Sequence, residues 1–393
     1  MIKKINKVAV IGSGIMGSRI ACHFANIGVE VLLLDIVHEG DDRNKIVNES
    51  LKNTLKSNPS PIYSKSFSNR IITGNLSDDI SKINEVDWII EVIIENLEIK
   101  KQLFSDIEKY RIPGTIISSN TSGIPINKMI EGRTDDFCQY FCGTHFFNPP
   151  RYLKLLEIIP SKKTHPELIS FLMSYGEKFL GKTTVLCKDT PAFIANRIGI
   201  AGIAALFKLS QDLGISVEEI DSLTGPIIGR PKSATFRTSD LVGLDTLNSV
   251  AKGVYDNCLD DEQREIFNLP PFINKMLEKK WLGDKTKQGF YKKDRDAKGN
   301  RKILSLNLNT LEYQEQRKTK FETIQKAKKI QNLQKRLPEL IQGEDKAAIF
   351  YKKMFAFMFA YVAHRIPEVS DEIYKIDAAM CAGFGWKIGP FEI

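Results

Sequence analysis

A glycine-rich turn near the N-terminus constrains the fold more than any other part of the sequence. The apolar run VAVI leads into the string GSGIMG, and an amphipathic stretch then continues from Gly14 to Gly28. In this spacing the first glycine permits a tight turn, the second lets the backbone approach a pyrophosphate, and the third allows close helix packing. Unpaired N–H groups at the helix N-terminus can then bind phosphates. The turn predicts a strand–turn–helix unit in which a dinucleotide contacts Gly12, Gly14, Ile15, Met16 and Gly17.

An acidic residue narrows the choice of dinucleotide. Asp35 lies eighteen residues after Gly17, at the end of the second apolar run. Its carboxylate can accept hydrogen bonds from ribose hydroxyls and would repel a 2′-phosphate. We therefore expect NAD as the cofactor in preference to NADP. FAD, or a glycine turn without any ligand, are the alternatives that these residues leave open.

Apolar β-branched runs alternate with helical segments over the first ~185 residues, which is typical of a parallel sheet with helices on both faces. The expected strands lie at residues 7–12, 29–35, 70–74, 88–94, 115–120, 141–147, 153–159 and 183–187. The expected fold class is α/β, with a Rossmann-type domain over residues 1–188.

The chain becomes helical in character after Lys188. Pro191 can occupy the first turn of a long apolar helix that runs through residues 195–214. Residues 215–231 have a later echo in residues 369–387, in which Asp221 and Gly229 match Asp377 and Gly385 at the same separation of eight. We expect a helical domain over 189–292, a basic linker over 293–345 and a partial second helical copy over 346–393. The second copy stops short at residue 393, which suggests that more sequence belongs to it.

The net charge of +8 is concentrated in one segment of the chain. Residues 292–336 contain fourteen Lys/Arg and five Asp/Glu, so the remainder of the chain is close to neutral. A solvated linker explains such a segment best, and a nucleic-acid partner is the alternative. The six cysteines lack CxxC spacing, so we expect neither disulfides nor a metal site. No apolar run reaches the ~18–20 residues needed to cross a bilayer, and a cytoplasmic location is expected.

His145 and Glu157 are the strongest candidates for chemistry. A histidine can remove a hydroxyl proton while hydride leaves the adjacent carbon, provided that a carboxylate fixes its tautomer and offsets its developing charge. The segment NPPRY joins the two expected strands that carry these residues, and neighbouring strands would bring the side chains together. This pair, downstream of the glycine turn, predicts a nicotinamide-dependent dehydrogenase that oxidises an alcohol.

Four segments extend this prediction to a family. The strings SNTSG, THFFNPP, LKLLEII and KDTPAFIANR resemble the 3-hydroxyacyl-CoA dehydrogenases, and the resemblance covers Lys7 to about Tyr291. It implies a 6-phosphogluconate-dehydrogenase-like helical domain after the Rossmann domain. It also implies that His145 is the acid/base, Glu157 its partner, and Ser122 and Asn196 the residues that hold the substrate. Near the nicotinamide half of NAD it places Glu95, Lys100, Asn120, Asn148 and Lys285, and near CoA it places Ser50 and Lys56, with Ser122 again on the substrate.

The implied reaction is the NAD-dependent oxidation of (S)-3-hydroxyacyl-CoA to 3-oxoacyl-CoA in fatty-acid β-oxidation. The implied partners are a second copy in a homodimer, an enoyl-CoA hydratase domain, and thiolase, with no nucleic acid and no membrane span. Two departures stand out: the element GPF occurs at 389–391 in the second copy instead of the first, and Lys287 replaces a common glycine. The first departure resembles larger bifunctional proteins. A β-hydroxyacid dehydrogenase of the 3-hydroxyisobutyrate type and a non-catalytic, crystallin-like NAD-binding protein are the alternatives.

Overall fold

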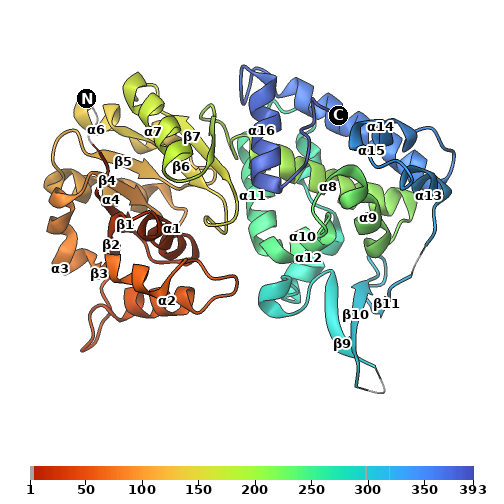
Figure 1. Ribbon diagram of the computed structural model, residues 1–393, viewed down its shortest axis with the longest axis horizontal. Helices are drawn as coiled ribbons and strands as arrows, with labels where there is room; N and C mark the ends of the chain where they lie inside the picture. The colour runs from red at the N-terminus through yellow and green to blue at the C-terminus, as the bar shows by residue number, and fades with distance from the viewer. Residues whose placement is uncertain (1–3, 297–298, 318) are drawn as a thin grey trace. The chain divides into compact units, whose positions relative to one another are not determined.

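The chain folds into two units, residues 1–193 and residues 194–393. The computed structural model describes residues 4–296, 299–317 and 319–393 (Figure 1). The sequence predicted a change of architecture near Lys188, and the contacts divide the chain between Phe193 and Ile194.

An eight-stranded sheet forms the centre of the first unit. Its strand order is β3-β2-β1-β4-β5-β6-β7-β8. The strands are β1 (Lys7–Ile11), β2 (Glu30–Asp35), β3 (Ile71–Asn75), β4 (Trp88–Glu91), β5 (Ile116–Ser119), β6 (Phe141–Phe146), β7 (Leu155–Pro160) and β8 (Thr183–Leu186). Each expected strand is present, and β1 sits at the switch between two crossover directions, where α/β sheets bind their ligands.

One pair of strands departs from the parallel arrangement that we expected. β7 runs antiparallel to β6, whereas β8 returns parallel to β7. The physical reason is the connection, because residues 147–154 are too few for the crossover of a dozen or more residues that a parallel neighbour requires. The sheet is therefore mixed at this edge.

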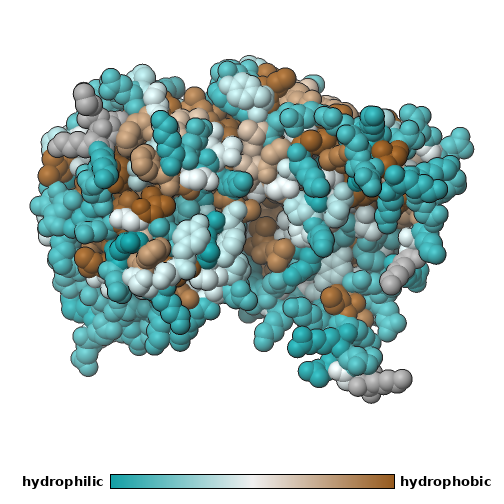
Figure 2. All heavy atoms as spheres, in the orientation of Figure 1, coloured by the Kyte–Doolittle hydropathy of each residue, from teal (hydrophilic) through white to brown (hydrophobic). Residues whose placement is uncertain are grey.

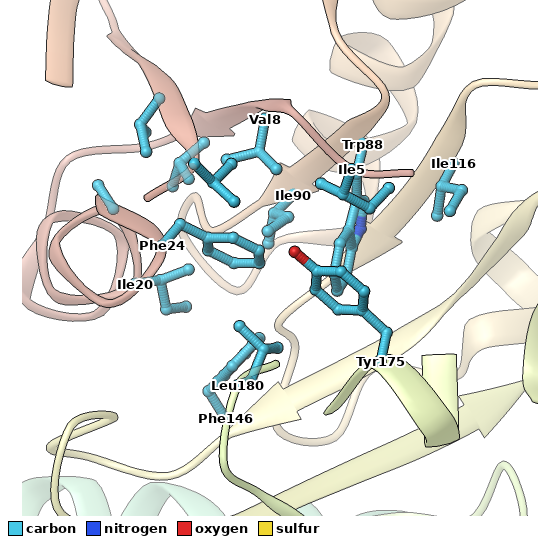
Figure 3. Close-up of a cluster of buried hydrophobic side chains, with 14 of the residues drawn as sticks. Ile5, Val8, Ile20, Phe24, Trp88, Ile90, Ile116, Phe146, Tyr175 and Leu180 are labelled. Atoms are coloured by element: carbon cyan, nitrogen blue, oxygen red, sulfur yellow. The ribbon is translucent and has the colours of Figure 1, made fainter. Parts of the chain in front are cut away.

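Helices cover both faces of the sheet. α1 and α7 pack on one face, where Ile20, Phe24 and Tyr175 meet strand residues such as Val8 and Trp88 in a buried cluster (Figure 3). On the other face, Phe104 of α4 and Phe137 of α6 contact Phe141 of β6. The helices of this unit are α1 (Ile15–Asn26), α2 (Lys45–Leu55), α3 (Leu76–Asp79), α4 (Leu97–Tyr110), α5 (Ile126–Met129), α6 (Asp135–Gln139) and α7 (Pro166–Lys178), with 3-10 turns η1 (Lys65–Arg70) and η2 (Ile80–Glu85).

The second unit is mainly helical, as the sequence predicted. Its helices are α8 (Ala195–Leu213), α9 (Val217–Thr224), α10 (Phe236–Val242), α11 (Leu244–Asn257), α12 (Pro271–Glu278), α13 (Glu322–Ala327), α14 (Leu333–Glu339), α15 (Lys346–His364) and α16 (Ile373–Phe384), with 3-10 turns η3 (Pro226–Ile228), η4 (Arg264–Phe267) and η5 (Asp284–Thr286). The apolar helix α15 is packed in this unit, with Phe350, Tyr351 and Tyr361 buried. Among the described residues, no helix is long and apolar enough to cross a membrane.

The expectation that Pro191 lies in the first turn of α8 is wrong. Ala192 and Phe193 have φ values of +62° and +52°, in the left-handed region, so a right-handed helix cannot include them. The helix begins at Ala195 instead. The left-handed pair turns the chain at the boundary between the two units.

The segment 293–345, which we expected to be a basic linker, contains regular secondary structure. The segment contains most of an antiparallel sheet of β9 (Tyr291–Arg295), β10 (Arg301–Leu306) and β11 (Tyr313–Glu315), followed by α13 and α14. Leu304 and Leu306 are buried, while the lysines and arginines face outward, and Figure 2 shows mostly hydrophilic side chains over this sheet. The high charge of the exposed positions hid the alternation of a half-buried hairpin.

Candidate active site

At two of the three glycine positions in the turn, a side chain would clash with the backbone. Gly12 has φ of +101°, and a Cβ added there would lie 2.5 Å from the carbonyl oxygen of Val92. A Cβ on Gly17 would lie 1.7 Å from the carbonyl oxygen of Gly12, so α1 could not stay so close to β1. A Cβ on Gly14 would meet nothing within 4 Å. The space over Gly14 is therefore open, which suits a ligand that approaches the backbone.

The N-terminus of α1 suits an anion. Gly14 is its N-cap and makes no side-chain cap, and the first turn carries no acidic residue. The first N–H groups of any helix lack intrahelical partners, and the helix dipole favours negative charge beside them. The open space over Gly14 and these N–H groups fit a dinucleotide pyrophosphate, with Ile15 and Met16 beside it.

Asp35 is held against the glycine turn. Its Oδ2 atom accepts hydrogen bonds from the Ser13 amide at 2.6 Å and the Ser13 hydroxyl at 2.5 Å. The Ile36 amide donates to its Oδ1 atom at 2.7 Å. The carboxylate is thus fixed at the end of β2, next to the turn.

His145 and Glu157 form a hydrogen-bonded pair. They are opposite each other in the β6–β7 register, and His145 Nδ1 lies 2.7 Å from Glu157 Oε2. His145 is 6% exposed and Glu157 is fully buried. Since Nδ1 contacts the carboxylate, Nε2 is the ring nitrogen that remains for a substrate.

Aromatic side chains surround the histidine ring. The ring centroid of His145 lies 4.8 Å from that of Phe147 and 5.6 Å from that of Phe193. Asp189 accepts hydrogen bonds from the backbone amides of Ile126 and Asn127, which ties the segment leading to Phe193 to α5. The pair therefore lies in a surrounding that excludes much of the water and strengthens electrostatic interactions.

A second group of polar residues lies at the ends of β4 and β5. Glu95 Oε1 accepts hydrogen bonds from the Ser122 amide at 2.7 Å and the Ser122 hydroxyl at 3.0 Å. Lys100 lies 3.4 Å from Glu95 and 2.6 Å from the fully buried Glu91. Burial raises the pKa of Glu91, and the adjacent lysine partly counteracts this. The expected residues Glu95, Lys100 and Ser122 are thus brought together.

The two asparagines of the prediction also lie in this unit. Asn120 Oδ1 accepts a hydrogen bond from the amide of Phe146, next to His145, at 2.9 Å. Asn148 is exposed, and its side chain accepts a hydrogen bond from Arg19 of α1 at 2.5 Å. Asn120 thus contacts the strand that carries the histidine, and Asn148 contacts the helix that follows the glycine turn.

Four predicted residues are not joined to these groups by any described contact. Ser50 is partly buried on α2, and Lys56 is exposed at the C-terminal end of that helix. Asn196 is partly buried at the second position of α8, and Lys285 forms an ion pair with Asp245, both within the second unit.

Two buried charged residues of the first unit, Glu91 and Lys182, were not predicted from the sequence as part of the site. Glu91 could have been identified from the sequence, because it is an isolated acidic residue in the apolar run WIIEVII. Lys182 gave no such signal: its ammonium donates hydrogen bonds to the carbonyls of Pro150 and of Leu153, the latter at 2.8 Å, and so fixes the 147–154 connection. Burial lowers the pKa of Lys182 to about 8.

The glycine turn and the His145–Glu157 pair both lie at the carboxyl edge of the parallel strands, the usual place for a ligand in such sheets. This places the first unit among the dinucleotide-dependent dehydrogenases. Residues 7–190 match the model of the 3-hydroxyacyl-CoA dehydrogenase NAD-binding domain, and residues 193–293 match that of the C-terminal domain of the same enzymes. The chain belongs to the 3-hydroxyacyl-CoA dehydrogenase family, whose members are NAD-dependent oxidoreductases.

Individual relatives agree with this assignment. A probable 3-hydroxyacyl-CoA dehydrogenase of Bacillus subtilis is 47% identical over 408 residues, covering all of this chain and 51% of the relative. Another, of Deinococcus radiodurans, is 46% identical over 296 residues, covering 75% of this chain and 85% of the relative. The crystal structure of 3-hydroxybutyryl-CoA dehydrogenase from Escherichia coli shares the fold, with a TM-score of 0.71 at 20% identity over 99% of this chain and 91% of that one. The chain spans about half the length of the Bacillus relative.

The family assignment confirms the predicted resemblance, the Rossmann domain followed by a helical domain, and the NAD cofactor. It favours the 3-hydroxyacyl-CoA enzymes over the alternative of a 3-hydroxyisobutyrate-type enzyme. The match of residues 7–190 to an NAD-binding domain likewise favours NAD over FAD.

Proposed function

We propose that this chain interconverts (S)-3-hydroxyacyl-CoA and 3-oxoacyl-CoA with NAD, as a step of fatty-acid β-oxidation. The observation that carries the proposal is the 2.7 Å contact between His145 and Glu157, in the same sheet as a glycine turn that fits a pyrophosphate. In the oxidative direction the hydroxyl carbon loses hydride and the hydroxyl oxygen loses a proton, which gives the ketone, NADH and H⁺.

His145 acts as the base in the proposed reaction. Bound NAD supplies the hydride acceptor. His145 Nε2 takes the hydroxyl proton, while Nδ1–H donates to Glu157, whose carboxylate stabilises the imidazolium that forms. In the reverse direction the same nitrogen returns the proton. The buried carboxylate also keeps the ring in the tautomer that presents Nε2 to substrate.

Ser122 and Asn196 are the proposed substrate ligands. The Ser122 hydroxyl donates to Glu95 in this structure, so it has to rotate from the carboxylate to the substrate oxygen. Thr121 also donates to Glu95, at 2.9 Å, and can keep that carboxylate in place when the serine leaves. A hydroxyl and an amide are suitable neutral donors for an oxygen that gains negative charge.

The other assignments complete the proposal. Glu95, Lys100, Asn120, Asn148 and Lys285 would lie near the nicotinamide half of NAD, and Ser50 and Lys56 near CoA. The proposed partners follow from the chemistry, because hydration of an enoyl-CoA supplies the substrate and a thiolase cleaves the 3-oxo product. An enoyl-CoA hydratase domain, a homodimer and a cytoplasmic location belong to the same proposal, as do the domain bounds 1–188, 189–292 and 346–393.

The test follows NADH consumption with acetoacetyl-CoA and with a longer 3-oxoacyl-CoA, using the whole chain and His145→Gln. We expect turnover by the wild type and a loss of at least ~100-fold in kcat in the variant, because acid–base catalysis contributes about that much or more. NADH binding, followed by fluorescence, should be the same in both proteins.

Two outcomes would contradict the proposal. A wild-type chain that binds NADH but reduces neither thioester would be the non-catalytic alternative that the sequence left open. A His145→Gln variant with wild-type kcat would show that another group moves the proton.

A further inference from the structure

A cavity of about 210 Å³ lies within the second unit, and none of its lining residues is assigned to the dehydrogenase reaction. Its walls come from α8 and α15, with contributions from the segments after α9 and α16. Figure 1 shows α8, α15 and α16 in the same part of the second unit, and α8 contacts both of the other helices. The cavity is therefore built by elements distant in sequence.

The two related helical segments meet at this cavity. Gly229 and Gly385, which correspond in the repeat, both adopt left-handed conformations, with φ of +75° and +68°. The next residues, Arg230 and Trp386, therefore occupy equivalent positions, and the guanidinium carbon of Arg230 lies 3.9 Å from the centroid of the Trp386 ring. The amide of Lys387 donates to the Gly229 carbonyl at 2.9 Å. The two copies thus present a cation and an aromatic ring to one space.

Arg230 has no carboxylate partner in the described part of the chain. Its guanidinium contacts the Met358 sulfur at 3.5 Å and the Trp386 ring, and neither can neutralise its charge. Burial lowers the pKa of Arg230 to about 10, so the group still carries its charge at neutral pH. Arg230 is only partly exposed, and a cation that is partly withdrawn from water is stabilised when an anion pairs with it. This guanidinium therefore lacks the partner that its surroundings favour.

The rest of the cavity is mostly apolar. Leu206, Met354 and Phe357 contribute to its wall, and Met358 lies beside the arginine. Lys208 and Lys353 lie at the same cavity, and Asp212 is the only carboxylate among its lining residues. The volume is below the ~300–1,000 Å³ of sites for drug-sized ligands, so a CoA thioester would not fit.

We propose that this cavity binds a small carboxylate with an alkyl chain, its carboxylate on Arg230 and its chain along the methionine and leucine side chains between α8 and α15. A guanidinium fork matches a carboxylate in shape and charge, and the flexible methionines can fit chains of different length. The cavity is lined only by residues of the second unit, so it would act as a second site for fatty acids released from, or related to, the thioester substrates.

The test measures binding of butyrate, hexanoate and octanoate to the whole chain by calorimetry, with 1-octanol as the uncharged probe. Affinity should rise about fourfold for each added methylene until the cavity is full. Arg230→Met should weaken octanoate binding at least tenfold and leave octanol binding unchanged. Quenching of Trp386 fluorescence, absent in Trp386→Phe, reports that the ligand lies at this site.

A second variant keeps the test decisive if Arg230→Met does not fold. Gly202 lies on α8 at the cavity, and a Cβ there would meet nothing within 4 Å, so Gly202→Leu should fill the space and abolish octanoate binding. Gly253→Leu on α11 is the matched control, because a Cβ at Gly253 is equally free and lies outside the cavity lining. Reduction of acetoacetyl-CoA reports that each variant is folded.

The proposal is overturned if no saturable octanoate binding appears at millimolar concentration, or if Gly202→Leu binds octanoate as the wild type does. Octanol bound as tightly as octanoate would show a merely apolar cavity. Octanoate binding lost in His145→Gln but kept in Gly202→Leu would place the ligand in the catalytic site instead.

Discussion

His145 Nδ1 lies 2.7 Å from Glu157 Oε2 because the two residues face each other across the antiparallel β6–β7 pair. Both side chains point to the face of the sheet opposite the α1–α7 cluster, since Phe146 and Leu156, their neighbours in sequence, belong to that cluster. The backbone register alone thus brings the imidazole and the carboxylate into contact.

Replacing the carboxylate should therefore slow the chemical step. In Glu157→Gln the amide keeps the shape but loses the charge that stabilises the imidazolium, so kcat for acetoacetyl-CoA should fall at least ~100-fold. Steady-state kinetics with NADH checks this. Glu30→Gln, an exposed glutamate on β2, is the control and should be indistinguishable from wild type. Equal kcat in the two variants would rule out the role given to Glu157.

The three glycines of the turn should respond differently to alanine. Gly17→Ala forces a Cβ against the Gly12 carbonyl, so both NADH affinity and stability should fall, the latter by about 1–3 kcal/mol. Gly14→Ala meets no protein atom, so NADH affinity should fall with a much smaller loss of stability. Fluorescence titration and urea unfolding separate the two effects. Unchanged NADH affinity in Gly14→Ala would show that the pyrophosphate does not lie over this residue.

Removing only one member of the buried ion pair between Glu91 and Lys100 should strongly destabilise the folded chain. Lys100→Met leaves a fully buried carboxylate without its cation, which should lower the free energy of unfolding by about 3–5 kcal/mol. The double variant Lys100→Met/Glu91→Gln should recover part of this loss. The adjacent Lys101, whose ion pair with Glu131 is exposed, is the control, and Lys101→Met should cost about 1 kcal/mol or less. The single variant Glu91→Gln completes the comparison. If the loss of unfolding free energy in the double variant equals the sum of the losses in the two single variants, Glu91 and Lys100 are not coupled.

Because Lys182 is buried, we expect the free energy of unfolding to depend on pH. Burial lowers its pKa in the folded chain to about 8, whereas an unfolded lysine titrates near 10.5. Between these values the unfolded chain binds more protons, so the free energy of unfolding should rise with pH from about 8 to 10.5. Urea unfolding at several pH values should show this rise in wild type, reduced in Lys182→Met. Lys178→Met, an exposed lysine on α7, should keep it.

Replacing Lys287 by glycine should stabilise the folded chain. It has φ of +61°, in the left-handed region that disfavours residues with a Cβ. Lys287→Gly removes this strain but gives the unfolded chain more freedom, so we expect a net gain of a few tenths to about 1 kcal/mol. The same substitution at Lys275, an exposed position within α12, should instead cost about 1 kcal/mol. Thermal unfolding of both variants tests the difference in sign.

The sequence was sufficient where local patterns determine the structure. The eight strands of the first sheet, helix α1 and the contact of His145 with Glu157 were all predicted, because apolar runs, a glycine turn and a short connection act locally. The position of Lys287 was also visible as a departure from a common glycine.

The sequence was insufficient where distant residues decide the outcome. The left-handed backbone at Ala192 and Phe193 displaced the start of α8, although the residues themselves are ordinary helix formers. The charged positions of β9 and β10 concealed a hairpin that becomes half-buried only against the helices of the second unit. The role of Lys182 depends on carbonyls some thirty residues earlier in the chain.

The antiparallel pair β6–β7 also has a consequence for how the chain folds. Parallel neighbours such as β1 and β4 associate only after a long crossover has closed, with Val8 opposite Trp88. His145 and Glu157 are twelve residues apart, and hairpins of that size close in microseconds, long before such crossovers are complete. The residues that would move the proton can thus meet early in folding, whereas the cofactor site has to wait for strands that are far apart along the chain.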